Sequence, residues 1–92
     1  MKIVINSCYG GFGLSEVALL RLGCENSFEY DDRRTDPALV SVVEGLGRLA
    51  SGYLSRLHVV EIPDEATDWE LNDYDGVESV TYVIDGKLKH KG

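Results

Sequence analysis

The chain has 92 residues, enough for one domain (residues 1–92) with a single core, and 43% of them are hydrophobic, a share typical of globular and not of disordered proteins. Its formal net charge of -7 repels the phosphates of DNA and RNA, so direct nucleic-acid binding is disfavoured. Apolar runs are only a few residues long, so we expect no membrane-spanning segment. Since no signal peptide is recognisable, we expect Cys8 and Cys24 to be reduced in the cytoplasm.

The first part of the chain predicts a strand, a glycine-rich bend and a short helix. Residues 2–6 contain three consecutive apolar, β-branched side chains, a pattern typical of a buried strand. A bend with three glycines follows at residues 10–13. Ser15 is a suitable N-cap for a helix that runs to Leu22, and Gly23 is suited to end it.

A second helix is predicted after a charged loop. Residues 27–30 suggest a short extended segment, because Phe28 and Tyr30 would share one face. Asp36 as N-cap and Pro37 at the first helical position open the helix, and an apolar stripe at helical spacing continues to residue 50. Two glycines within this helix, Gly45 and Gly47, predict that another backbone passes close by.

The second half of the chain predicts strands. Residues 57–62, 69–71 and 79–84 have strand character, and Asp85-Gly86 predicts a hairpin turn with a short returning strand. The order βα(β)αββββ indicates an α+β fold, with two helices packed on one mixed sheet of four to five strands.

Six segments can be matched to a family. They are Lys2–Asn6, Cys8–Phe12, Leu14-Ser15, Arg34–Pro37, Val59–Asp64 and Tyr74–Gly76. In this order they resemble a group of small hypothetical proteins of bacteriophages and prophages, over residues 2 to about 78. The resemblance implies an accessory protein of phage type that acts in the cytoplasm of a bacterial host. It implies no particular activity.

The glycine-rich bend is one candidate site. A strand, a glycine bend and a helix N-terminus can direct backbone N–H groups at an anion. The residue after Gly13 is Leu14 and not the lysine of a P-loop, and Leu14 also stands where a cysteine phosphatase loop has its arginine. Binding of a small anion or nucleotide and a purely structural bend both remain open. The ligand-binding candidates are Gly10, Gly11, Gly13, Ser15, Arg33 and Arg34.

An acidic segment is the other candidate. Between Glu61 and Glu78 there are eight acidic residues and no basic one. Such a segment can bind a basic surface on a host protein, for example one that handles nucleic acid or serves in defence, and inhibit it. Trp69 and Tyr74 would be its aromatic anchors, unless Trp69 faces the core. The partner-binding candidates are Asp64, Asp68, Trp69, Asp73, Tyr74 and Asp75.

No set of residues predicts an enzyme. Cys8 could act as a nucleophile with His58 as its base, but no spacing supports this pairing. We expect no metal site and no cofactor. The β-prone, uncharged segment 79–84 is expected at a sheet edge, where two copies could pair into a homodimer.

Overall fold

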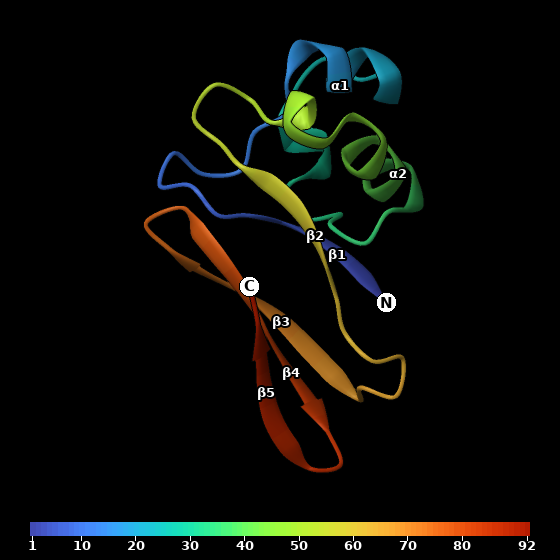
Figure 1. The fold of residues 1–92 in the computed structure, drawn as a ribbon, viewed down its shortest axis with the longest axis vertical. Coiled ribbons are helices and arrows are strands. Elements are labelled where there is room, and N and C mark those ends of the chain that lie inside the picture. Colours follow the sequence, from blue (N-terminus) through green and yellow to red (C-terminus); the bar gives the residue numbers. More distant parts are fainter.

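The fold, a computed structural model that describes residues 1–92, has three layers (Figure 1). The helical layer contains α1 (Glu16–Leu22), α2 (Pro37–Leu46) and the 3₁₀ helices η1 (Ser27–Tyr30) and η2 (Gly47–Ala50). The middle layer is a sheet of β1 (Lys2–Asn6) and β2 (Leu57–Glu61). The third layer is a sheet of β3 (Asp68–Tyr74), β4 (Val77–Ile84) and β5 (Lys87–Lys91), in that order. None of the helices combines the length and apolar composition needed to cross a bilayer.

The α+β class is confirmed, but the strands form two antiparallel sheets and not one mixed sheet. β4 lies against a face of β1 and does not pair with its edge. The free edge of β1 is already occupied, because the Val4 N–H donates to the Arg34 carbonyl at 2.9 Å and the Asn6 N–H donates to Glu78 Oε1 at 2.8 Å. No third strand can therefore join β1 on that side.

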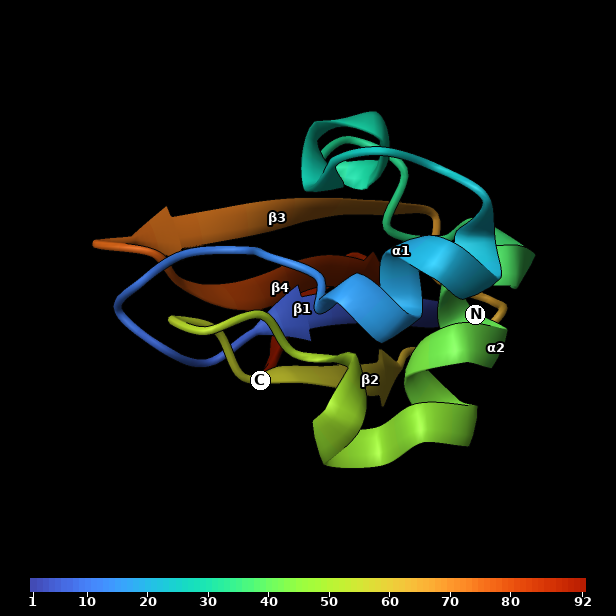
Figure 2. The same cartoon turned by 90° about the horizontal axis from the view of Figure 1, so that it is seen from above.

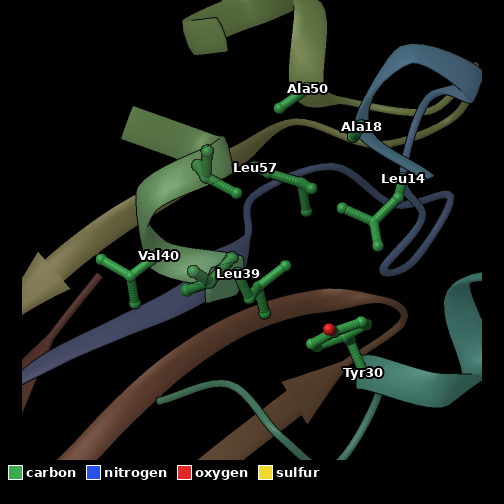
Figure 3. Close-up of a cluster of buried hydrophobic side chains, with 9 residues drawn as sticks. Leu14, Ala18, Tyr30, Leu39, Val40, Ala50 and Leu57 are labelled. Carbon is green, nitrogen blue, oxygen red and sulfur yellow. The ribbon is translucent and has the colours of Figure 1, made fainter. Parts of the chain in front are cut away.

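Strand β1 is buried on both of its faces, as its apolar run predicts. Val4 points into a cluster formed with the helices, drawn in Figure 3. Ile3 and Ile5 point the other way, into a second cluster with Val80 and Tyr82 of β4. Each of the three β1 side chains is 0% exposed. β1 thus joins the two cores of the molecule, because alternate residues of a strand face opposite sides.

The predicted ends of the two helices are confirmed at three of four positions. Ser15 Oγ accepts a hydrogen bond from the Ala18 N–H, and Gly23 ends α1 with φ of 69°. Asp36 caps α2, with Pro37 in its first turn. The predicted C-terminal end of the second helix, at residue 50, is wrong, because α2 ends at Leu46 and residues 47–50 form the 3₁₀ helix η2.

Two further expectations for the helical half are wrong. Residues 27–30 form η1 and not an extended segment, because the side chain of Asn26 accepts the Phe28 N–H and caps a helical turn. Gly45 and Gly47 do not mark a close approach, since a Cβ at either position would meet no atom within 4 Å. Gly47 instead ends α2, with a φ of 57°.

The C-terminal sheet contains the predicted Asp85-Gly86 turn and a second Asp-Gly turn, but not the predicted edge. Asp75-Gly76 and Asp85-Gly86 each connect two strands, with positive φ at every one of the four residues. The Asp85-Gly86 turn returns β5 along residues 80–84 of β4. β4 is therefore the central strand, and the segment 79–84 offers no free edge on which a homodimer could form. The free edges of this sheet belong to β3 and β5.

Candidate functional site

Three loops meet at one end of the molecule. Residues 7–13, 52–56 and 74–77 lie side by side in Figure 1 and again in the turned view of Figure 2, and we call this region the three-loop end. Their backbones are in close contact. A Cβ on Gly10 would overlap the Leu54 carbonyl, and a Cβ on Gly76 would lie 2.6 Å from the Tyr9 carbonyl oxygen. Glycine is required at both positions because any side chain would push the loops apart.

The side chain of Asn6 connects all three loops. Its Nδ2 donates to the Cys8 carbonyl at 2.7 Å and to the Gly76 carbonyl at 2.6 Å. Its Oδ1 accepts the Arg56 N–H at 2.7 Å and the Cys8 N–H at 3.3 Å. One carboxamide, 0% exposed, thus uses both donors and both acceptor positions. Because a buried amide is costly to leave unpaired, these bonds fix the loops relative to one another.

A buried ion pair lies beside Asn6. Arg34 donates to Glu78 through Nη1 at 2.6 Å and through Nη2 at 2.8 Å, and the two side chains are each 4% exposed. Glu78 Oε1 also accepts the Asn6 N–H, so the pair and the carboxamide form one network. The guanidinium stacks on the ring of Phe12 at 3.8 Å from its centroid. The network gives the three-loop end a rigid base.

Each of the three loops carries one exposed tyrosine. Tyr9, Tyr53 and Tyr74 are 75%, 100% and 77% exposed, and each comes from a different loop. Leu54, beside Tyr53, is 60% exposed. Tyrosine combines a large apolar ring with a polar hydroxyl, and such residues are enriched in the centres of protein interfaces. The three-loop end therefore has the composition of a contact surface.

The structure divides the predicted partner-binding residues between the two ends of β3. Tyr74 and Asp75 belong to the three-loop end and Asp73 adjoins it, whereas Asp68 lies at the start of the strand, about 17 Å from Asp73 at 3.3 Å per residue. Asp73 Oδ1 accepts the Gly76 N–H at 2.8 Å and so supports the turn.

The remaining two partner-binding candidates have contacts near the start of β3. Asp64 pairs with the amino group of Met1 at 2.7 Å, and this hydrogen bond lowers the pKa of Asp64 below its ordinary value. Trp69 packs against the second core, as the alternative interpretation of this residue predicts. The acidic residues between Glu61 and Glu78 thus do not form one continuous face.

The glycines and the serine of the bend are used within the fold. Gly10 packs on Leu54, and Gly11 N donates to the Cys8 carbonyl at 3.2 Å. The Gly13 carbonyl accepts the Gly52 N–H at 2.9 Å. Ser15 caps α1 and also donates its hydroxyl to the Leu49 carbonyl at 2.6 Å. The bend is therefore held by hydrogen bonds and packing within the fold. The helix that follows it, α1, has only seven residues.

The two predicted anion-binding arginines have partners of their own. Arg33 pairs with Asp36 at 2.8 Å and lies over the ring of Tyr30, 4.7 Å from its centroid. Arg34 is buried in the pair with Glu78. Both guanidinium groups are thus paired with carboxylates, Arg34 in a buried pair and Arg33 in a pair at the surface.

The cysteines are free thiols on separate segments. Burial is the main cause that raises the pKa of the Cys24 thiol, which makes it a weak nucleophile at neutral pH. Cys8 lies in the first loop of the three-loop end, and no hydrogen bond joins it to His58, which is opposite Ile5 in β2. No group of three or more His, Cys, Asp or Glu side chains is placed to hold a metal ion.

Sequence reasoning missed four residues of this region: Asn6, Tyr9, Tyr53 and Glu78. A polar residue at the end of an apolar strand was the available signal for Asn6. Tyr9 and Tyr53 give no local signal, because their proximity depends on contacts between distant loops.

Comparisons of the chain with protein-family models, with curated proteins and with solved structures give no match. The role that we propose for the three-loop end therefore rests on its own residues and contacts.

Proposed function

We propose that this chain is a non-enzymatic binding protein whose three-loop end docks onto a protein surface rich in lysine and arginine. One observation carries the proposal: three exposed tyrosines, one from each loop, stand on loops that the carboxamide of Asn6 holds together. Side chains presented on a rigid base lose little conformational entropy on binding. Tyrosine has only two side-chain torsions, which keeps that cost low.

The charge around the third loop favours a basic partner. Asp73 and Asp75 are exposed on either side of Tyr74, and the whole chain carries a formal charge of -7. Opposite charges speed association and exclude partners of like charge. Asp68 and Trp69 lie at the far end of β3, and Asp64 lies in the loop before that strand, so none of them is part of the proposed contact.

The resemblance to phage proteins indicates where the partner would be found. A cytoplasmic protein of the bacterial host is the expected partner, and a basic protein that handles nucleic acid or serves in defence matches the chemistry. Binding of this kind would inhibit the partner by covering its basic surface.

Two equivalent turns allow a controlled test of the charge. Asp75 and Asp85 have φ of 53° and 52°, each is followed by glycine, and they lie at opposite ends of β4. Asparagine adopts this backbone readily, so Asp75→Asn and Asp85→Asn each remove one charge and keep the turn. Only Asp75→Asn should weaken binding.

The aromatic contacts are tested in the same way. We expect the tagged wild-type chain to capture a basic protein from host lysate, and the purified pair to bind more weakly as salt rises. Tyr53→Ser with Tyr74→Ser should abolish capture. Phe28→Ser, which removes an 85% exposed aromatic ring from η1, should not. Equal affinity of the purified partner for all these variants would refute the proposal.

A further inference from the structure

A polar hollow of about 400 Å³ lies between η2 and the start of β2. Four residues line it: Arg48, Ser51, Ser55 and Arg56. None of them is hydrophobic and none is acidic. In a chain with a formal charge of -7, two arginines facing one hollow reverse the local sign of charge.

Both arginines are without a protein partner. Arg33 and Arg34 pair with carboxylates, whereas the guanidinium groups of Arg48 and Arg56 take part in no ion pair and no hydrogen bond. Glu44, one helical turn before Arg48, pairs with Lys2 instead. Two unpaired guanidinium groups can donate in parallel to the oxygens of an anion.

The serines are held in place by the backbone around the hollow. Ser51 Oγ accepts the Leu57 N–H at 2.8 Å, so its own hydroxyl hydrogen is free to donate. The Ser55 hydroxyl donates to the Gly13 carbonyl at 2.6 Å and fixes the loop that carries Arg56. The hollow thus combines one available hydroxyl donor with two guanidinium groups.

We infer that this hollow binds a phosphate group, either as inorganic phosphate or as the phosphomonoester of a small molecule. The planar guanidinium matches phosphate oxygens in pairs, and a hydroxyl donor suits a further oxygen. A polyanion such as DNA is not the ligand, because the acidic remainder of the chain would repel it. This site uses side chains and not the backbone of the glycine bend, and it shares Ser55 and Arg56 with the second loop of the three-loop end.

The test is a titration of the ¹⁵N-labelled full chain with inorganic phosphate, at constant ionic strength kept with chloride. We expect saturable shifts in the amide signals of residues 48–57. Arg48→Ala with Arg56→Ala should weaken this binding about tenfold or more. Arg21→Ala is the matched control, because Arg21 is an exposed arginine outside the hollow, and it should leave the affinity unchanged.

A second variant separates specific binding from simple charge attraction. Arg48→Lys with Arg56→Lys keeps both charges and loses the paired donors, so we expect several-fold weaker binding. A nucleoside monophosphate compared with the same nucleoside distinguishes a phosphomonoester from free phosphate as the preferred ligand. Shifts that do not saturate, or that are the same in the lysine variant and the wild type, would overturn the inference.

Discussion

Arg34 and Glu78 are 44 residues apart in sequence and form a buried, two-point ion pair, with N–O distances of 2.6 and 2.8 Å. The pair also completes the free edge of β1. The Arg34 carbonyl accepts the Val4 N–H, and Glu78 Oε1 accepts the Asn6 N–H. An edge strand is thereby closed by two residues in place of a third strand. Asn6 links this pair to the three-loop end, because its N–H donates to Glu78 and its side chain bonds to all three loops. We therefore expect both the stability of the fold and the arrangement of the loops to depend on the pair.

Glu78→Ala should lower the free energy of unfolding by about 3 kcal/mol, because it removes the buried two-point partner of Arg34 and leaves only the exposed Asp31, at 3.3 Å, as a carboxylate partner. Urea denaturation followed by circular dichroism measures the change. Glu70→Ala is the control, since Glu70 is an exposed glutamate on the neighbouring strand β3 and should change stability by less than about 0.5 kcal/mol. A loss for Glu78→Ala of no more than the control would contradict the role given to the pair.

Asn6→Ala should destabilise the protein by about 3 kcal/mol or more, because it leaves the carbonyls of Cys8 and Gly76 and the N–H of Arg56 without their partner. Hydrogen exchange of the Arg56 amide should become faster at the same time. The control is Asn72→Ala, which removes bonds to Thr81 and Ser79 on the half-exposed face of β3 and should cost about 1 kcal/mol. Equal losses in the two variants would show that Asn6 has no special role.

Much of the local structure could be predicted from the sequence because its causes are local. Ser15 and Asp36 cap helices through bonds to residues two or three positions ahead. The two Asp-Gly turns follow from residues that accept positive φ. The buried strand follows from an apolar run. Where a local rule failed, another local contact decided the outcome, as with the Asn26 cap of η1.

The candidate site could not be predicted, because long-range contacts form it. Asn6 bonds to residues 50 and 70 positions away, and no pattern near Asn6 indicates either partner. Arg34 follows two aspartates and reads as part of a solvated loop, yet its main partner comes from β4. The separation of the strands into two sheets has the same origin, since Arg34 and Glu78 occupy the edge of β1.

Gly76→Ala should cost clearly more stability than Gly86→Ala. Both glycines have positive φ, 89° and 72°, so each substitution carries the same backbone penalty of about 1–2 kcal/mol. A Cβ at Gly86 would meet no atom within 4 Å, whereas one at Gly76 would lie 2.6 Å from the Tyr9 carbonyl oxygen and 2.7 Å from the Gly11 nitrogen. Thermal unfolding should show the larger fall in midpoint for Gly76→Ala. An equal fall in the unfolding midpoint of the two variants would contradict the prediction, and would mean that the loops around Gly76 move apart at little cost.

The last prediction concerns the pH dependence of stability at Asp36. The hydrogen bond from the Ala38 N–H, helped by Arg33, lowers the pKa of Asp36 below its ordinary value of 3.8. A carboxyl group whose pKa is lower in the folded state contributes stability that is complete above 3.8 and disappears as the pH falls through the folded value. Asparagine is also a good N-cap, so Asp36→Asn should keep α2 and remove only this titration.

The wild type should therefore lose more stability than Asp36→Asn between about pH 5 and about pH 2, in urea unfolding curves recorded across that range. Asp32→Asn is the matched control, because it makes the same change of charge at an exposed aspartate whose carboxylate forms no ion pair. Its loss of stability should follow that of the wild type. If Asp36→Asn loses as much as Asp32→Asn on acidification, the cap of α2 does not depend on the charge of Asp36.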